Sequence, residues 1–202
     1  SMIIMSLGGA SFNRILVEFS SEAVAAFQIG IRLDHFFLIP AISISTSVVT
    51  LVGMFYGAKK FKLAKEITLY AIRSTILIGI LIGFIFFIFS DNIVSIFSDN
   101  TNIQNISSQY LRYFVFGYPF IAISMISGRA MQGLGKGVPM LVLTLLRVLV
   151  ISLAFSVFFV FFLKKSIEWV WISQVISVII SALIAWFWLI HVFNKINSER
   201  KK

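Results

Sequence analysis

The sequence predicts an all-α, polytopic membrane protein in which residues 1–202 form a single six-helix transmembrane bundle. Hydrophobic residues make up 59% of the chain and charged residues only 12%, and the mean hydropathy is +0.98. A water-soluble domain of this length could not bury so much apolar surface in one core. Several apolar stretches also reach the roughly 20 residues that a helix needs to cross a bilayer. The lipid bilayer is therefore an expected partner.

The apolar stretches divide the chain into candidate spans at 2–19, 23–57, 63–90, 105–128, 138–163 and 168–194. The first is short and is interrupted by Asn13 and Arg14, so we interpret residues 1–19 as the truncated remnant of a longer helix. The second is too long for one straight crossing. Pro40 lies inside it, where a missing N–H and a steric clash would kink the helix.

Charge in the links predicts the orientation of the bundle. The link 91–109 has two acidic residues and four asparagines but no Lys or Arg, so we expect it outside the cell. Its apolar residues predict a short amphipathic segment in the membrane interface, formed by Ile93, Val94, Ile96 and Phe97. The basic links 58–66 and 129–137 and the basic tail 195–202 are expected in the cytoplasm. This places the protein in the plasma or inner membrane with a cytoplasmic C-terminus.

Composition and motifs argue against several functional classes. The net charge of +9 comes from basic residues in links and at the C-terminus, where lipid headgroups account for them, so we expect no nucleic-acid partner. The chain has no cysteine and only two histidines, His35 and His191, far apart in sequence. No metal site, cofactor or enzymatic activity is expected, and no Gly-rich nucleotide-binding motif is present. The run Gly133, Gly135, Gly137 is typical of a turn between helices.

Ionisable residues inside apolar spans are the first candidates for function, because burying them in lipid is costly. Asp34 is an acid that could bind and release a proton, or hold Na+, in a buried cavity. Arg32 lies two residues away and must point to a different helix face. Asp34 could instead form an ion pair with Arg14 or Arg147 that fixes helix register, or line a solvated cavity. The full set of cavity and coupling candidates is Asp34, Arg32, Asn13, Gln28 and Arg147.

Three stretches together resemble the C-terminal half of a multidrug and toxin extrusion (MATE) transporter of the prokaryotic type. They are residues 22–32 leading to Pro40, residues 52–60, and a long stretch from Tyr110 through Tyr118 and residues 128–136 to Pro139 and Arg147. Their order and spacing match helices seven to twelve of that family, and the resemblance covers essentially the whole chain.

The resemblance implies one lobe of a pseudo-symmetric twelve-helix transporter, which exchanges organic cations for Na+ or H+ by rocking between inward-open and outward-open forms. Its partners would be a missing N-terminal six-helix lobe, which would hold most of the coupling-ion site, and a lipophilic or cationic small molecule. Met5 and Ile121 stand where one branch of the family has a Glu and an Asp. The hinge and packing candidates are Pro40, Gly57, Pro119, Gly133 and Pro139.

Three functions stay open at the level of sequence. The leading hypothesis is the second lobe of an ion-coupled exporter of drugs or metabolites. A flippase for lipid-linked saccharides would need several arginines in its cavity to bind pyrophosphate, and Arg14, Arg32 and Arg147 are available. A non-transporting membrane scaffold would instead pair its intramembrane charges with one another.

Overall fold

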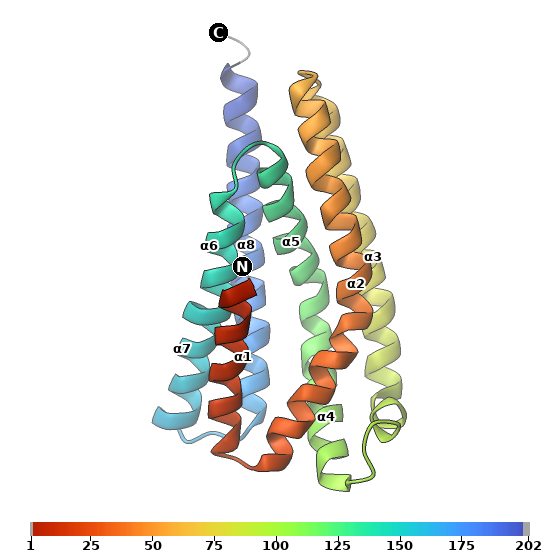
Figure 1. Ribbon diagram of the computed structural model, residues 1–202, viewed down its shortest axis with the longest axis vertical. Helices are drawn as coiled ribbons and strands as arrows, with labels where there is room; N and C mark the ends of the chain where they lie inside the picture. The colour runs from red at the N-terminus through yellow and green to blue at the C-terminus, as the bar shows by residue number, and fades with distance from the viewer. Residues whose placement is uncertain (1, 200–202) are drawn as a thin grey trace.

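The computed structural model describes residues 2–199, and helices occupy all six predicted spans (Figure 1). The first three helices are α1 (Met2–Val17), α2 (Ser21–Gly57) and α3 (Phe61–Ser95). The fourth span consists of α4 (Thr101–Phe114), a 3₁₀ turn (Val115–Gly117) and α5 (Tyr118–Gly133). The fifth contains α6 (Val138–Leu145), a π-helical segment (Leu146–Ile151), α7 (Ser152–Val157) and a second π-helical segment (Phe158–Phe162). The last helix is α8 (Glu168–Glu199).

Five of these stretches are long and apolar enough to cross a membrane: Ser21–Gly57, Phe61–Ser95, Thr101–Gly133, Val138–Phe162 and Glu168–Ile196. The predicted fold class, an all-α membrane bundle, is therefore confirmed. α1 is shorter, with 16 residues. In Figure 1 it runs beside α7, along only part of the length of the bundle.

The short amphipathic segment predicted within residues 91–109 is continuous with α3 in part. α3 continues to Ser95 beyond a kink at Phe89, and α4 already begins at Thr101. Val94 is fully buried within the helix bundle, whereas Ile96 is largely exposed. Ile93 and Val94 belong to the last turn of α3, whereas Ile96 and Phe97 follow its end. The tail from residue 195 also begins as helix, because α8 continues to Glu199, and residues 200–202 lie outside the described part.

Side-chain caps explain where two of the helices begin. The Ser20 side chain accepts a hydrogen bond from the Ala23 N–H at 3.1 Å, at the start of α2. The Asn100 side chain accepts from the N–H groups of Asn102 and Ile103 at the start of α4. Both caps satisfy backbone donors that have no partner within the helix.

The interior contains two packed clusters at opposite ends of the bundle. The aromatic cluster joins α1, the first half of α2, the end of α3, α4 and the starts of α5 and α8; its rings include Phe12, Phe27, Phe37, Phe86, Tyr110, Tyr118 and Trp171. The aliphatic cluster joins the second half of α2, the start of α3, α5, α6 and the end of α8; its members include Val48, Val52, Ala64, Ile72, Ile126, Ala130, Leu143, Ala185 and Leu189.

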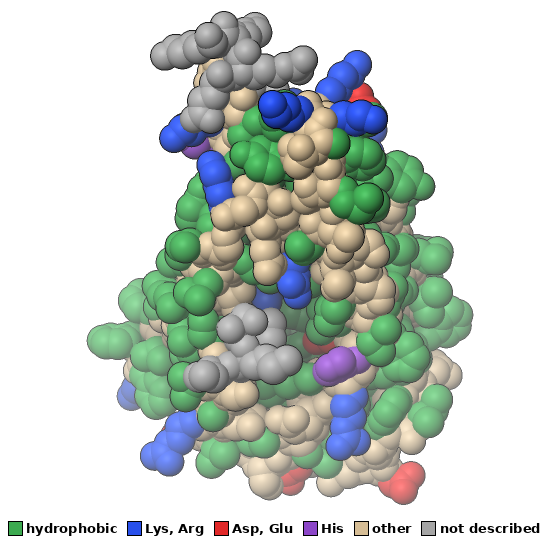
Figure 2. Space-filling view, turned by 45° about the horizontal axis from the view of Figure 1, so that its top comes forward, with side chains coloured by type: hydrophobic (Ala, Val, Ile, Leu, Met, Phe, Trp, Pro, Cys, Tyr) green, Lys and Arg blue, Asp and Glu red, His purple; other side chains and the backbone are tan. Residues whose placement is uncertain are grey.

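The outer surface is suited to lipid. α3 exposes a long series of large apolar side chains, among them Leu77, Ile80, Leu81, Phe84 and Ile88. Figure 2 shows hydrophobic side chains covering both flanks between two ends at which charged side chains gather. This banded pattern is the one expected of a chain with lipid around its middle and water at its ends.

Candidate functional site

Asp34 lies on the inward face of α2, within the aromatic cluster. Its neighbours Leu33 and Phe37 are buried with it, and Asp34 itself is only 5% exposed. Arg32 and His35, on the other faces of the same turns, are exposed. The sequence expectation that Arg32 and Asp34 face different ways is therefore confirmed, and the acid is the one that faces the other helices.

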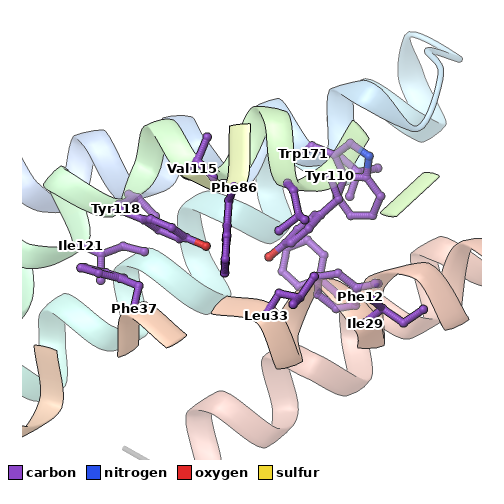
Figure 3. Close-up of a cluster of buried hydrophobic side chains, with 14 of the residues drawn as sticks. Phe12, Ile29, Leu33, Phe37, Phe86, Tyr110, Val115, Tyr118, Ile121 and Trp171 are labelled. Atoms are coloured by element: carbon purple, nitrogen blue, oxygen red, sulfur yellow. The ribbon is translucent and has the colours of Figure 1, made fainter. Parts of the chain in front are cut away.

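Two tyrosine hydroxyls bind the Asp34 carboxylate. Tyr110 of α4 donates a hydrogen bond to Oδ2 at 2.6 Å, and Tyr118 of α5 donates to Oδ1 at 2.8 Å. Figure 3 shows the two phenol oxygens pointing toward one another, from either side of the 3₁₀ turn between their helices. Each carboxylate oxygen thus has one charge-assisted hydrogen bond, which stabilises the buried acid where an apolar neighbour could not.

The predicted ion pair of Asp34 with Arg14 or Arg147 was wrong. Among the described residues, Asp34 has no basic group within 4.0 Å of its carboxylate. Arg14 is exposed on α1, and Arg147 is half-buried in the π-helical segment of the fifth span. Tyrosines fill the role instead because they combine a large apolar ring, which suits the core, with a donor at the tip.

Glycines allow the tyrosines to approach so closely. A Cβ atom on Gly30 would overlap the ring of Tyr110. A Cβ on Gly79 of α3 would lie 3.3 Å from the Tyr118 Cβ and 3.1 Å from the ring of Phe37. Helices that pack through small residues bring their backbones together in this way within membranes.

Stacked rings hold the two tyrosines in place. Phe37 stacks on Tyr118 with ring centroids 4.6 Å apart, and Phe114 stacks on Tyr110 at 5.2 Å. The edge of Tyr110 meets Trp171 of α8 at 5.0 Å. Because both hydroxyls are fixed by these contacts, their positions around Asp34 are set before any ligand binds.

A cavity of about 240 Å³ lies directly beside this cluster. Most of its wall is aromatic or aliphatic, and the polar side chains are few. The wall is formed by Gly8, Gly9, Phe12, Phe27, Ile31, Asp34, Leu38, Tyr110, Phe114, Tyr118, Ile121, Arg147, Val148, Ser152, Gln174, Ser177 and Val178. A largely apolar pocket with a few convergent polar groups is the usual form of a small-molecule site.

The cavity-lining residues of the fifth span and α8 include two donor groups. Arg147 comes from the π-helical segment, a widened helical turn of a kind that is frequent at functional sites. Gln174 of α8 is 8% exposed, and its buried Nε2 has no hydrogen-bond partner within the described protein. The sequence analysis did not identify Gln174, since one Gln in an apolar helix carries no distinguishing pattern.

The structure brings together only part of the predicted site. Asp34 and Arg147 share the cavity wall, whereas Arg32, Asn13 and Gln28 are not among the residues that line it. The Gln28 side chain instead donates to the Asn13 Oδ1 at 3.2 Å in an exposed contact between α1 and α2. Ile121 lines the cavity, and the side chain of Met5 lies outside the described residues.

The hinge and packing candidates occupy different positions in the fold. Pro40 lies inside α2, which continues through it as one helix, and Gly57 is the last residue of that helix. Pro119 and Pro139 occupy the first turns of α5 and α6, where a missing N–H costs no helical hydrogen bond.

Gly133, the fifth candidate, ends α5 where that helix crosses α2. A Cβ atom there would lie 2.7 Å from the Val49 carbonyl oxygen. Gly133 is therefore a close-packing residue. The turn that follows it contains Gly135 at a φ of +80°, as the glycine run predicted.

The MatE family model matches residues 1–158 of the chain. The chain belongs to the MatE family. A probable multidrug resistance protein NorM from Thermotoga maritima is 27% identical over 180 residues, which cover 87% of this chain and 38% of that protein. A FAD transporter from Shewanella oneidensis is 24% identical over 151 residues, covering 75% of this chain and 33% of that protein. The chain thus spans less than half the length of these relatives.

Solved structures of MATE proteins share the fold of this chain. MATE in the straight conformation superposes with a TM-score of 0.93 at 21% identity, covering 98% of this chain and 44% of that one. A MOP superfamily transporter from Pyrococcus furiosus superposes with a TM-score of 0.91 at 22% identity, covering 96% of this chain and 44% of that one. The resemblance to a MATE half-transporter is therefore confirmed, and the chain is an integral membrane protein that matches part of a transporter.

Proposed function

We propose that this chain is one lobe of an ion-coupled exporter, which works with a second six-helix lobe and binds its coupling ion at Asp34. One observation carries the proposal: a buried carboxylate within a membrane-spanning helix borders a cavity and is held by two hydroxyls rather than by a basic residue. An intramembrane acid that faces a cavity is a site where ion binding can change the local charge by a full unit.

The geometry favours a proton over Na+ at this site. Both carboxylate oxygens already accept O–H donors, and the other cavity-lining groups next to them are largely hydrocarbon. A Na+ ion would need several oxygen ligands in place of these donors. A proton needs only one carboxylate oxygen, and its arrival removes an acceptor from one tyrosine.

Protonation of Asp34 would act directly on helix packing. The carboxylate on α2 accepts from Tyr110 on α4 and from Tyr118 on α5, so it joins three helices. A neutral carboxyl group accepts hydrogen bonds more weakly than a carboxylate, and its own O–H group needs an acceptor. The link between α2 and the α4–α5 stretch would loosen, which provides a physical step between ion binding and a rocking motion.

A lipophilic organic cation is the substrate class that the cavity supports. Aromatic faces attract cations, and here they surround a carboxylate. The names of the relatives, multidrug resistance protein and FAD transporter, are compatible with export of bulky organic molecules. A flippase has less support, because only Arg147 of the three candidate arginines lines the cavity. A scaffold has less support because Asp34 lacks a charge partner among the described residues.

Reconstitution of the two lobes together tests the proposal. The chain is co-expressed with a matching N-terminal lobe, and ethidium efflux from proteoliposomes is followed under an imposed pH gradient. We expect efflux from the two-lobe assembly and none from this chain alone. Efflux by the single lobe, or none from a correctly assembled pair, would contradict the proposal.

The proposed cytoplasmic C-terminus follows from the basic residues near the α2–α3 turn and the end of α8, which lie at the same end of the bundle (Figure 1). Fusion of green fluorescent protein or alkaline phosphatase to the C-terminus tests it. We expect a fluorescent green fluorescent protein fusion and an inactive phosphatase, and an active phosphatase would reverse the orientation.

A further inference from the structure

The wall of the cavity beside Asp34 carries two chemically different sets of polar groups. The first set is the carboxylate and its two tyrosine hydroxyls, which are already engaged with each other. The second set is Arg147 and Gln174. Within the described residues, Arg147 has no carboxylate within 4.0 Å, and the Gln174 Nε2 has no acceptor.

The unpaired groups are both donors. A guanidinium group only donates hydrogen bonds, and so does the amide nitrogen of Gln. Leaving such a group buried without an acceptor costs free energy, and buried donors in native proteins are nearly always satisfied by protein, water or ligand. Gln174 is more than nine-tenths buried and lines the cavity. The Gln174 amide nitrogen is therefore available to an acceptor oxygen in the cavity.

We propose that the site selects dipolar substrates, which present a cationic group to Asp34 and a carboxylate or other acceptor oxygen to Gln174 and Arg147. This inference rests on the proposed function and narrows its substrate class: zwitterions are preferred over cations that lack an acceptor group. The negative Asp34 and the positive Arg147 on one cavity wall give the field that would orient such a molecule.

The arrangement is consistent with exchange for a proton. While Asp34 is ionised, the two ends of a zwitterion meet opposite charges. When a proton reaches Asp34, the attraction for the cationic end is lost and only the Arg147 end remains. Substrate and proton therefore compete at one end of the site, as an exchanger requires.

A pair of dyes that differ by one methyl ester, and so in net charge, tests the inference. Rhodamine 110 is a zwitterion with a free carboxylate, and rhodamine 123 is its cationic methyl ester. Binding to the purified two-lobe transporter is measured by fluorescence polarisation, and export is followed in proteoliposomes. We expect rhodamine 110 to bind about tenfold more tightly, since a charge-assisted hydrogen bond to a buried donor contributes at about that level.

Two variants locate the effect. Gln174→Leu and Arg147→Met should each weaken rhodamine 110 binding about fivefold to tenfold while changing rhodamine 123 binding less than about twofold. Ser173→Ala is the matched control on α8, because Ser173 is buried but bonds the Trp169 carbonyl and does not line the cavity. It should alter neither dye.

The outcomes separate this inference from the proposed function. Two results would overturn the dipolar site and leave water as the partner of Gln174: equal affinity of the transporter for both dyes, or an equal loss of affinity for both dyes in Gln174→Leu. Selective binding without export would retain the dipolar site and contradict the exporter. If Arg147→Met does not fold, Gln174→Leu alone tests the dipolar site, because it replaces the donor amide with an apolar side chain of similar size.

Discussion

The aromatic and aliphatic clusters lie at opposite ends of the bundle and differ in composition. The aromatic cluster surrounds a carboxylate, two hydroxyls and a cavity of about 240 Å³. The aliphatic cluster is built mainly from Ala, Val, Ile and Leu, and its helices meet as closely as Gly133 and the Val49 carbonyl. The contrast indicates that the buried polar groups and the mainly aliphatic packing are separated along the same helices.

The largest expected effect is the loss of ion-driven export in Asp34→Asn. An amide cannot ionise, so gradient-driven ethidium efflux from the two-lobe assembly should fall about 100-fold, and the fold should survive because Asn still accepts from a tyrosine. Asp91→Asn is the control, since this exposed acid pairs with Arg112 at the surface and should change efflux less than about twofold. Full ethidium efflux by Asp34→Asn would contradict the proposal that Asp34 binds the coupling ion.

At the aliphatic end, Gly133→Ala should reduce stability. The new Cβ would meet backbone at 2.7 Å, which the helices relieve only by moving apart, at a cost of about 2 kcal/mol. Thermal unfolding in detergent, followed by tryptophan fluorescence, measures the loss. Gly57→Ala is the control, because nothing lies within 4 Å of its added Cβ. An unchanged melting temperature would show that this end is less tightly packed than the distances imply.

Removing one tyrosine hydroxyl should weaken export less than removing the acid. In Tyr110→Phe or Tyr118→Phe the carboxylate keeps one donor of two, and we expect efflux to fall about tenfold, the level of one charge-assisted hydrogen bond. Initial efflux rates measure this, with the exposed Tyr70→Phe as the matched control. If the double variant Tyr110→Phe/Tyr118→Phe exports normally, the hydroxyls are only structural neighbours.

The smallest expected effect concerns the bond between the Ser124 and Ser181 hydroxyls, which lie 2.9 Å apart between α5 and α8. Ser181→Ala should cost about 0.6 kcal/mol, the average found for such contacts in membranes. Ser43→Ala, at an exposed serine that bonds its own helix, is the control in the same melting experiment. A loss above about 2 kcal/mol would mean that polar contacts hold the bundle more strongly than the aliphatic packing does.

Sequence periodicity identified the helices because a lipid-crossing helix must satisfy its own backbone and cover it with apolar side chains, which leaves a long, local signal. It failed where the signal was short. From the sequence, residues 93–97 fit an interfacial segment as well as the end of a long helix, and the structure places only residues 93–95 within α3. Asp34 was identifiable as a buried acid, since a charge in an apolar span stands out on its own.

By itself, the sequence determined the fold class, the family resemblance and Asp34 as the acid to examine. The tertiary structure decided what Asp34 contacts. Tyr110 and Tyr118 lie 76 and 84 residues away along the chain, and Gln174 reaches the cavity from the last helix. The residues next to it along the helix predict whether a side chain is exposed to lipid, whereas its hydrogen-bond partner depends on the relative rotation of helices that are distant in sequence. The sequence pattern of one helix does not determine that rotation.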